Sequence, residues 1–219
     1  MWAGNAWALN LDFSNLPGAY IQFDGSTDTF SFTNSFHITN SDSLGKTGEG
    51  LSGNIGGSFT IGTVSPSVSY QSAPVTGTGT FTISDGSQSL TADIAWNDAA
   101  TSGGSFATFG LLNLPGAVNL THILYSGSNT DLLTIKSAGD GIVTASFQFI
   151  PGLTLQQLKD GDTYQSSYSG TLNASGTLNA APIPGTLLLL GAGLVGMGLC
   201  RPRMAAWAYT SSKARNRKD

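Results

Sequence analysis

Apolar and polar residues alternate in short runs through most of this 219-residue chain, and turn sequences separate the runs. Three pairs of runs are joined by an Asp-Gly dipeptide, at residues 24–25, 85–86 and 140–141. Alternation gives a strand one apolar face, and Asp-Gly between alternating runs is a strong hairpin signal. The pattern therefore predicts an all-β fold, an antiparallel β-sandwich of jelly-roll-like or Greek-key topology with three such hairpins.

The apolar residues beside these turns are spaced two apart and should line the core. They are Ile21, Phe23, Phe30 and Phe32 at the first turn, Phe81, Ile83, Leu90, Ala92, Ile94 and Trp96 at the second, and Leu133, Ile135, Val143, Ala145, Phe147 and Phe149 at the third. Further strands are expected near 57–63, 67–71, 75–83, 104–112, 117–125 and 164–178. One short helix is expected to begin after Thr154 and to end at Gly161.

Charge is distributed unevenly along the chain. Residues 9–181 carry 12 acidic residues, three lysines and no arginine, whereas six basic residues follow Cys200. An acidic body without arginine argues against nucleic-acid binding, which needs Lys and Arg to neutralise phosphates. Cys200 is the only cysteine, so no intramolecular disulfide can form and sheet packing must stabilise the domain.

Residues 185–200 form an uncharged apolar run between a proline element and a basic cluster. As a helix, these 16 residues cover about 24 Å of a hydrocarbon core about 30 Å thick. Pro184 and Arg201 can extend the span at its two ends. We therefore expect a single C-terminal transmembrane helix, followed by a basic cytoplasmic tail at 204–219, with the body exported.

An exported body needs an export signal at its N-terminus. The first eight residues end in Ala6-Trp7-Ala8, the small-x-small pattern that signal peptidase accepts. We therefore expect residues 1–8 to be the remnant of a signal peptide that is cleaved after Ala8. The exported part then divides into an extracellular all-β domain at 9–171 and a linker at 172–181, which has few apolar residues to bury.

The C-terminal segment 182–203 resembles the PEP-CTERM sorting signals of Gram-negative bacteria. The resemblance rests on the element Pro182, Ile183, Pro184 and Gly185, on the Leu- and Gly-rich run, and on the basic stop Arg201 and Arg203. In that family an exosortase, a membrane-embedded protease or transpeptidase, recognises the tail and cuts near the proline element. The resemblance implies an exosortase partner, a transient membrane anchor and a product outside the cell. It implies no activity for the β domain.

No catalytic motif is found in the body, and we expect no enzymatic activity. His122 shares a strand face with Leu120 and Leu124 and should be a core histidine, whereas His37 has no motif around it. The chain has no Gly-x-Ser-x-Gly, His-Glu-x-x-His or Cys-x-x-Cys sequence. We therefore expect neither a nucleophile–base pair nor a metal site with nitrogen or sulfur ligands.

Two ligand sites are weak candidates. Calcium takes oxygen ligands, and Asp160 and Asp162 are the densest acidic pair, although a glycine between them is better explained as a helix C-cap. A glycan site uses exposed aromatic side chains. Trp96 alternates with core residues, whereas Tyr164 and Tyr168 lie four apart and should share one face of a strand.

These features favour a structural or adhesive protein of the cell surface or extracellular matrix, associated with biofilm or exopolysaccharide. A carbohydrate-binding module, assisted by calcium, is the alternative, and exposed tyrosines beside a groove would favour it. A glycoside hydrolase-like enzyme is the third reading, which requires two aspartates roughly 5 to 9 Å apart across a cleft.

Overall fold

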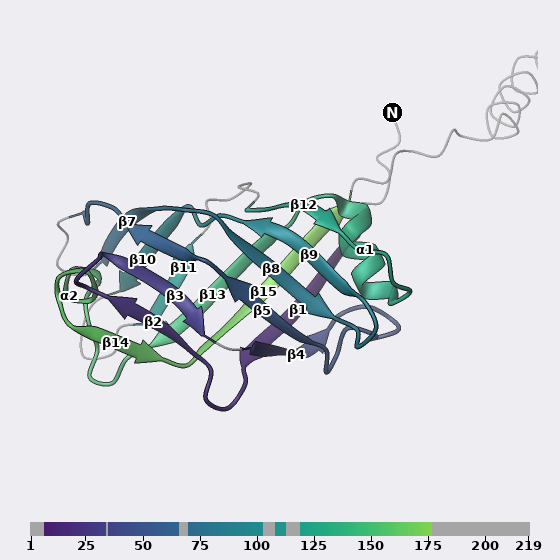
Figure 1. Cartoon of the computed structure of the whole chain (residues 1–219), viewed down its shortest axis with the longest axis horizontal. Coiled ribbons are helices and arrows are strands. Elements are labelled where there is room, and N and C mark those ends of the chain that lie inside the picture. Colours follow the sequence, from purple (N-terminus) through teal and green to yellow (C-terminus); the bar gives the residue numbers. More distant parts are fainter. Residues whose placement is uncertain (1–6, 34, 66–69, 103–107, 113–118, 177–219) are drawn as a thin grey trace, which may run out of the picture. The chain divides into compact units, whose positions relative to one another are not determined.

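The computed structural model describes residues 7–33, 35–65, 70–102, 108–112 and 119–176, all within one compact unit (Figure 1). This unit is all-β, with two curled antiparallel sheets, and the described ranges contain two short helices. The expected transmembrane helix lies outside the described residues, as do the rest of the sorting signal and the basic tail. Within the described ranges, no helix has the length and hydrophobicity needed to cross a membrane.

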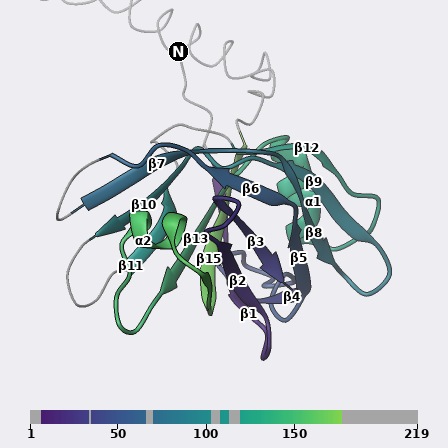
Figure 2. The ribbon, with the colours of Figure 1, turned by 60° about the vertical axis from the view of Figure 1, so that its left-hand side comes forward.

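Fifteen strands follow one another in a single hydrogen-bonded antiparallel series. The larger sheet contains, in spatial order, β12 (Leu120–Leu124), β9 (Ser89–Ile94), β8 (Gly79–Ser84), β5 (Ser52–Gly56), β4 (Ser35–Ser41), β1 (Trp7–Asn15), β15 (Tyr168–Gly176), β13 (Ile142–Gln148), β11 (Thr108–Leu112), β10 (Asp98–Ser102) and β7 (Tyr70–Thr76). From β7 the series continues into the smaller sheet through β6 (Ser58–Ile61), β3 (Thr29–Thr33), β2 (Tyr20–Asp24) and β14 (Thr163–Ser166). Figure 2 shows the larger sheet curling from β11 and β13 on one side to β8 and β9 on the other.

Two of the three expected Asp-Gly hairpins are confirmed. Strands β2 and β3 pair with Phe23 opposite Phe30, and strands β8 and β9 pair with Phe81 opposite Ala92. In the second hairpin, the Asp85 carboxylate accepts hydrogen bonds from two backbone N–H groups of its own turn. These local hydrogen bonds explain why the dipeptide is a reliable turn signal.

The third expected hairpin is wrong, because the segment before residues 140–141 is a helix, α1 (Thr130–Ala138). The Asn129 side chain caps its N-terminus, and Gly139 ends it in the left-handed conformation with φ of 80°. Leu132 and Ile135, three residues apart, are both fully buried, whereas Leu133 is 36% exposed. The burial therefore follows a helical period and not the alternation that predicted a strand.

The expected strand at 164–178 is two strands that belong to different sheets. Strand β14 ends at Ser166 in the smaller sheet, and β15 begins at Tyr168 in the larger sheet. Strand β15 continues to Gly176, with Leu172 and Ala174 buried. The β domain therefore extends beyond the expected boundary at residue 171, into the segment 172–181 that was expected to be a linker.

The short helix predicted after Thr154 is confirmed as α2 (Leu155–Asp160). Thr154 and Gln157 form a capping box, and Gly161 is the C-cap. The two helices lie at opposite ends of the unit in the view of Figure 1.

Aromatic side chains of the two sheets meet in one shared core. Phe23 of the smaller sheet packs on Phe147 of the larger sheet with ring centroids 5.0 Å apart. Phe32 lies against Trp96 at 5.9 Å and against Tyr168 at 5.0 Å. Trp96 is 2% exposed, which confirms its predicted place in the core. The unit is thus a two-layer structure in which each sheet covers the apolar face of the other.

Asn119 joins β12, an end strand of the series, back to β13. Its side-chain amide donates to the Val143 carbonyl at 2.9 Å and accepts from the Val143 N–H at 2.7 Å. Beside it, Leu120 and Gly141 form a backbone bridge. Since Asn119 is only 3% exposed, both halves of its amide are satisfied inside the protein.

Asp131, at the start of α1, anchors the helix to the loop that follows β4. One carboxylate oxygen accepts from the Ser41 hydroxyl at 2.8 Å and from the Gly48 N–H at 2.7 Å. Burial raises the pKa of Asp131, but hydrogen bonds from Ser43, Ser41, Gly48 and Thr47 outweigh burial and hold the pKa below its ordinary value. Asp131 is only 2% exposed. Because its pKa is lowered in the folded state, the charged carboxylate is the form that stabilises the fold.

Replacing Asn119 by Ala should lower the free energy of unfolding by about 2–3 kcal/mol, because it removes the two buried hydrogen bonds between the Asn119 amide and the Val143 backbone. Asn54→Ala, at an exposed position of β5, is the control and should change stability by less than about 0.5 kcal/mol. Urea denaturation measures both. Equal effects of the two substitutions would contradict the role assigned to Asn119.

Asp131→Asn should cost about 2 kcal/mol near neutral pH, because charge-assisted hydrogen bonds are lost. The folded-state pKa of Asp131 is depressed, so its contribution is present above the unfolded pKa and is lost as the pH falls through the folded pKa. The stability difference between wild type and variant should therefore shrink below about pH 4. A constant difference in denaturation curves from neutral pH to acid would contradict this account; Asp162→Asn, at an exposed position, is the control.

Candidate functional site

The two tyrosines predicted to form a glycan platform do not share an exposed face. Tyr164 lies on β14 and is half-buried against Phe149, whereas Tyr168 lies on β15 and is 2% exposed. Burial raises the pKa of Tyr168 to about 12. The chain passes from one sheet to the other at Ser167, and this change of sheet separates two side chains that a single strand would have aligned.

The weak calcium candidates lie at the end of α2. Asp160 accepts a hydrogen bond from the Gln156 side chain, four residues earlier in the same helix, and Asp162 is exposed just after the Gly161 cap. Across the described ranges, no three His, Cys, Asp or Glu side chains are grouped closely enough to hold a metal ion. Calcium binding at Asp160 and Asp162 stays a prediction.

The predicted processing residues fall mostly outside the described ranges. This holds for Ala6 and for the sorting residues Pro182, Ile183, Pro184, Gly185, Arg201 and Arg203. Ala8 is described, and it lies in β1 opposite Ser175 of β15. Cleavage after Ala8 would leave the pairs from Leu9 to Ser14 in place, so β1 would keep most of its contacts.

His122 is not a core residue, contrary to the sequence-based expectation. Its side chain is 82% exposed, and its backbone lies in the left-handed region with φ of 52°. The pairing of β12 with β9 shifts register between Thr121 and Leu124, as it does at a β-bulge. Because of this shift Leu120 and Ile123 are buried, whereas Leu124 is 67% exposed.

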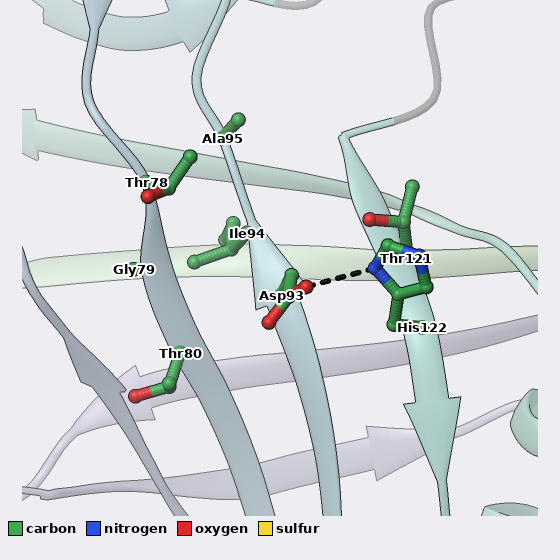
Figure 3. Close-up of a pocket in the computed structure, with 8 residues that line it drawn as sticks. All are labelled: Thr78, Gly79, Thr80, Asp93, Ile94, Ala95, Thr121 and His122. Atoms are coloured by element: carbon green, nitrogen blue, oxygen red, sulfur yellow. Dashed lines mark hydrogen bonds and ion pairs between the residues drawn. The ribbon is translucent and has the colours of Figure 1, made fainter.

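The bulge directs His122 toward Asp93 on the neighbouring strand β9, as Figure 3 shows. The imidazole Nδ1 lies 2.8 Å from a carboxylate oxygen of Asp93. A carboxylate only accepts, so Nδ1 carries the proton and Nε2 of the neutral ring is left as an acceptor. Both side chains are largely exposed, at 82% for His122 and 60% for Asp93, so the pair adds little to stability.

A hollow of about 460 Å³ surrounds this pair on the outer face of β8, β9 and β12 (Figure 3). Thr80 lies opposite Asp93, and Asp93 lies opposite Thr121, so these three side chains form one row across three adjacent strands. Thr78 adds a third exposed hydroxyl at the rim. The hollow therefore offers several hydroxyl groups, one carboxylate and one imidazole to a ligand.

A second hollow, which is polar and has a volume of about 500 Å³, is lined by Asp85, Ser87, Gln88 and residues 126–129. Polar groups at this hollow already form hydrogen bonds with one another within the fold. The Tyr125 hydroxyl donates to the Asp85 carboxylate and accepts from the Asn129 N–H at 2.9 Å. The hydrogen bond from Tyr125, followed by those from two turn N–H groups, holds the pKa of Asp85 below its usual value. This hollow marks a structural junction between the β8–β9 turn and the start of α1.

Sequence reasoning missed Asp93 and misplaced His122. Regular alternation along 118–124 predicts an inward histidine, and it fails because one extra residue in the bulge shifts the pattern. A left-handed histidine has no reliable sequence signal.

Comparison with known proteins places the chain in no family: no protein-family model, curated protein or solved structure matches it. Function must therefore be argued from the residues themselves.

Replacing His122 by Gly should leave the free energy of unfolding unchanged or raise it by up to about 1 kcal/mol, because glycine adopts positive φ without strain. The adjacent Thr121→Gly is the control and should cost about 1 kcal/mol, because glycine is unfavourable in a regular strand. Thermal and urea unfolding of the two variants measure the difference. If both substitutions destabilise equally, His122 is not strained.

Proposed function

We propose that this chain is an exported protein of the cell surface or extracellular matrix, with a structural or adhesive β domain and a C-terminal sorting signal. The observation that carries the proposal is the outer face of the larger sheet. Its side chains are short, polar and mostly neutral, and they line up in cross-strand rows.

Around the centre of the sheet, β1, β15 and β13 align their outward side chains. The rows are Ser14, Ser169 and Ser146, then Asp12, Thr171 and Thr144. On the other side, β5, β8 and β9 align Ser52, Ser84 and Ser89, then Asn54, Thr82 and Thr91. Hydroxyl and amide groups bind water and sugar hydroxyls without attracting ions. Such a surface suits lasting contact with a hydrated, uncharged matrix.

The arrangement of the strands fits the sandwich topology that we assign to the domain. The apolar residues of both sheets gather in one core without any disulfide. Strand β1 lies between β4 and β15, which are far apart in the sequence, as in the jelly-roll-like or Greek-key sandwiches to which we assign the domain. The proposal keeps the apolar segment 185–200 as a transmembrane helix and an exosortase-type enzyme as the partner that removes it.

The proposal can be tested by producing the chain behind a signal peptide, in a host with an exosortase-type enzyme and in an isogenic strain without it. With the enzyme, intact mass should show a released product that lacks residues beyond about 181. Without the enzyme, or in the variant Pro182→Ala with Pro184→Ala, the chain should keep its apolar run and remain with the membrane fraction. Lys213→Ala, outside the proline element, is the control and should be processed normally. Peptides from residues 185–200 in the released product would overturn the proposal.

A further inference from the structure

We propose that the hollow around Asp93 and His122 binds a neutral saccharide unit. We name it the Asp93–His122 hollow, lined by Thr78, Thr80 and Thr121 in addition to the pair. The choice of a saccharide as ligand rests on the adhesive role in the proposed function. The hollow itself is formed without any residue of the sorting signal.

The backbone at His122 supports a site. A non-glycine residue with φ of 52° is uncommon and costs energy, and such residues cluster where a side chain has a task. Here the bulge turns His122 outward, so that Thr121 and His122, which are adjacent in the chain, are both exposed on the same face of the sheet. Packing of the imidazole in the core does not explain this strained backbone, because the His122 side chain is 82% exposed.

The polar groups of the hollow complement a polyol. Three threonine hydroxyls can each donate and accept, Nε2 of His122 accepts, and the second carboxylate oxygen of Asp93 accepts as well. Vicinal hydroxyl groups of a sugar can donate to the carboxylate and imidazole while accepting from the threonines. The row of Thr80, Asp93 and Thr121 presents these groups at strand spacing, about 4.8 Å apart.

Other ligand classes fit less well. An anion would meet Asp93, and neither lysine nor arginine lines the hollow to offset that charge. An apolar ligand would find no large apolar side chain to cover, since the Ile94 side chain is 1% exposed and faces the core. A metal ion would have two of the His, Cys, Asp and Glu side chains, and one oxygen of Asp93 is already bonded to the imidazole. The volume of about 460 Å³ lies in the range of small-molecule sites.

The chain's two histidines make the experiment selective, because each gives separate imidazole C–H signals in NMR spectra. The full-length protein is titrated with methyl β-glucopyranoside and methyl α-mannopyranoside. At least one should shift the His122 signals saturably, with a dissociation constant in the millimolar range, and leave the His37 signals unchanged. Methyl glucuronide, which is anionic, should bind more weakly than the neutral glucoside, because the Asp93 carboxylate repels its negative charge.

Variants are compared by saturation transfer to the sugar protons, which needs no histidine signal. Asp93→Asn should weaken binding about tenfold or more, and His122→Gly should abolish it while the fold stays stable. Asp42→Asn, an exposed carboxylate remote from the hollow, should bind as wild type does.

The proposal is overturned if neither neutral glycoside shifts His122 at concentrations up to about 100 mM. It is also overturned if glucosamine or Zn²⁺ shifts His122 and the neutral sugars do not, because the site would then be one for cations. A negative titration leaves the processing experiment intact, and a failure of processing leaves the titration intact, so the two proposals fail separately.

Discussion

The whole unit depends on one apolar layer shared by two sheets. No disulfide is available, so the contact of Phe23 with Phe147, and of Phe32 with Trp96 and Tyr168, must hold the sheets together. Every strand that contributes to this layer has to present its opposite side to solvent, which is why the side chains on the outer faces are mostly polar. The hydroxyl rows and the Asp93–His122 hollow exist on surfaces that the shared core creates.

Buried polar side chains connect elements that apolar packing alone does not hold together. Asn119 joins β12 to β13, Asp131 ties α1 to the loop after β4, and Tyr125 links Asp85 to the start of α1. Each replaces lost water contacts with hydrogen bonds inside the protein, as a buried polar group must. The exceptions among the described residues are Nε1 of Trp96, the Tyr168 hydroxyl and Nδ1 of His37, which are buried without a partner. Two of these three lie against the same ring, Phe32, at the junction of the sheets.

The sequence predicted correctly those turns and helix ends that are stabilised by interactions within a few residues. The Asp24 and Asp85 turns and the Thr154 cap are stabilised within a few residues, and the sequence therefore revealed two hairpins and one helix. The segment before Gly139 was misread, because a short apolar run fits a strand or a helix equally well and the Asn129 cap decides between them. The bulge at His122 and the change of sheet at Ser167 depend on strands distant in the chain. Alternation cannot reveal either, so the tyrosine platform was predicted and the histidine hollow was not.

The antiparallel pairing of β1 with β15 also decides how the domain responds to force. Its first described residue, Trp7, lies directly opposite its last, Gly176, and eight residue pairs run from there to Ser14 and Ser169. Tension applied between these two ends acts along the inter-strand hydrogen bonds, which lie perpendicular to the strands, and opens the pairs one at a time. Such unzipping yields easily, whereas strands pulled lengthwise must break all their bonds together. The fold is thus mechanically suited to be held by one end and to present its face, and poorly suited to serve as a link in a chain under load.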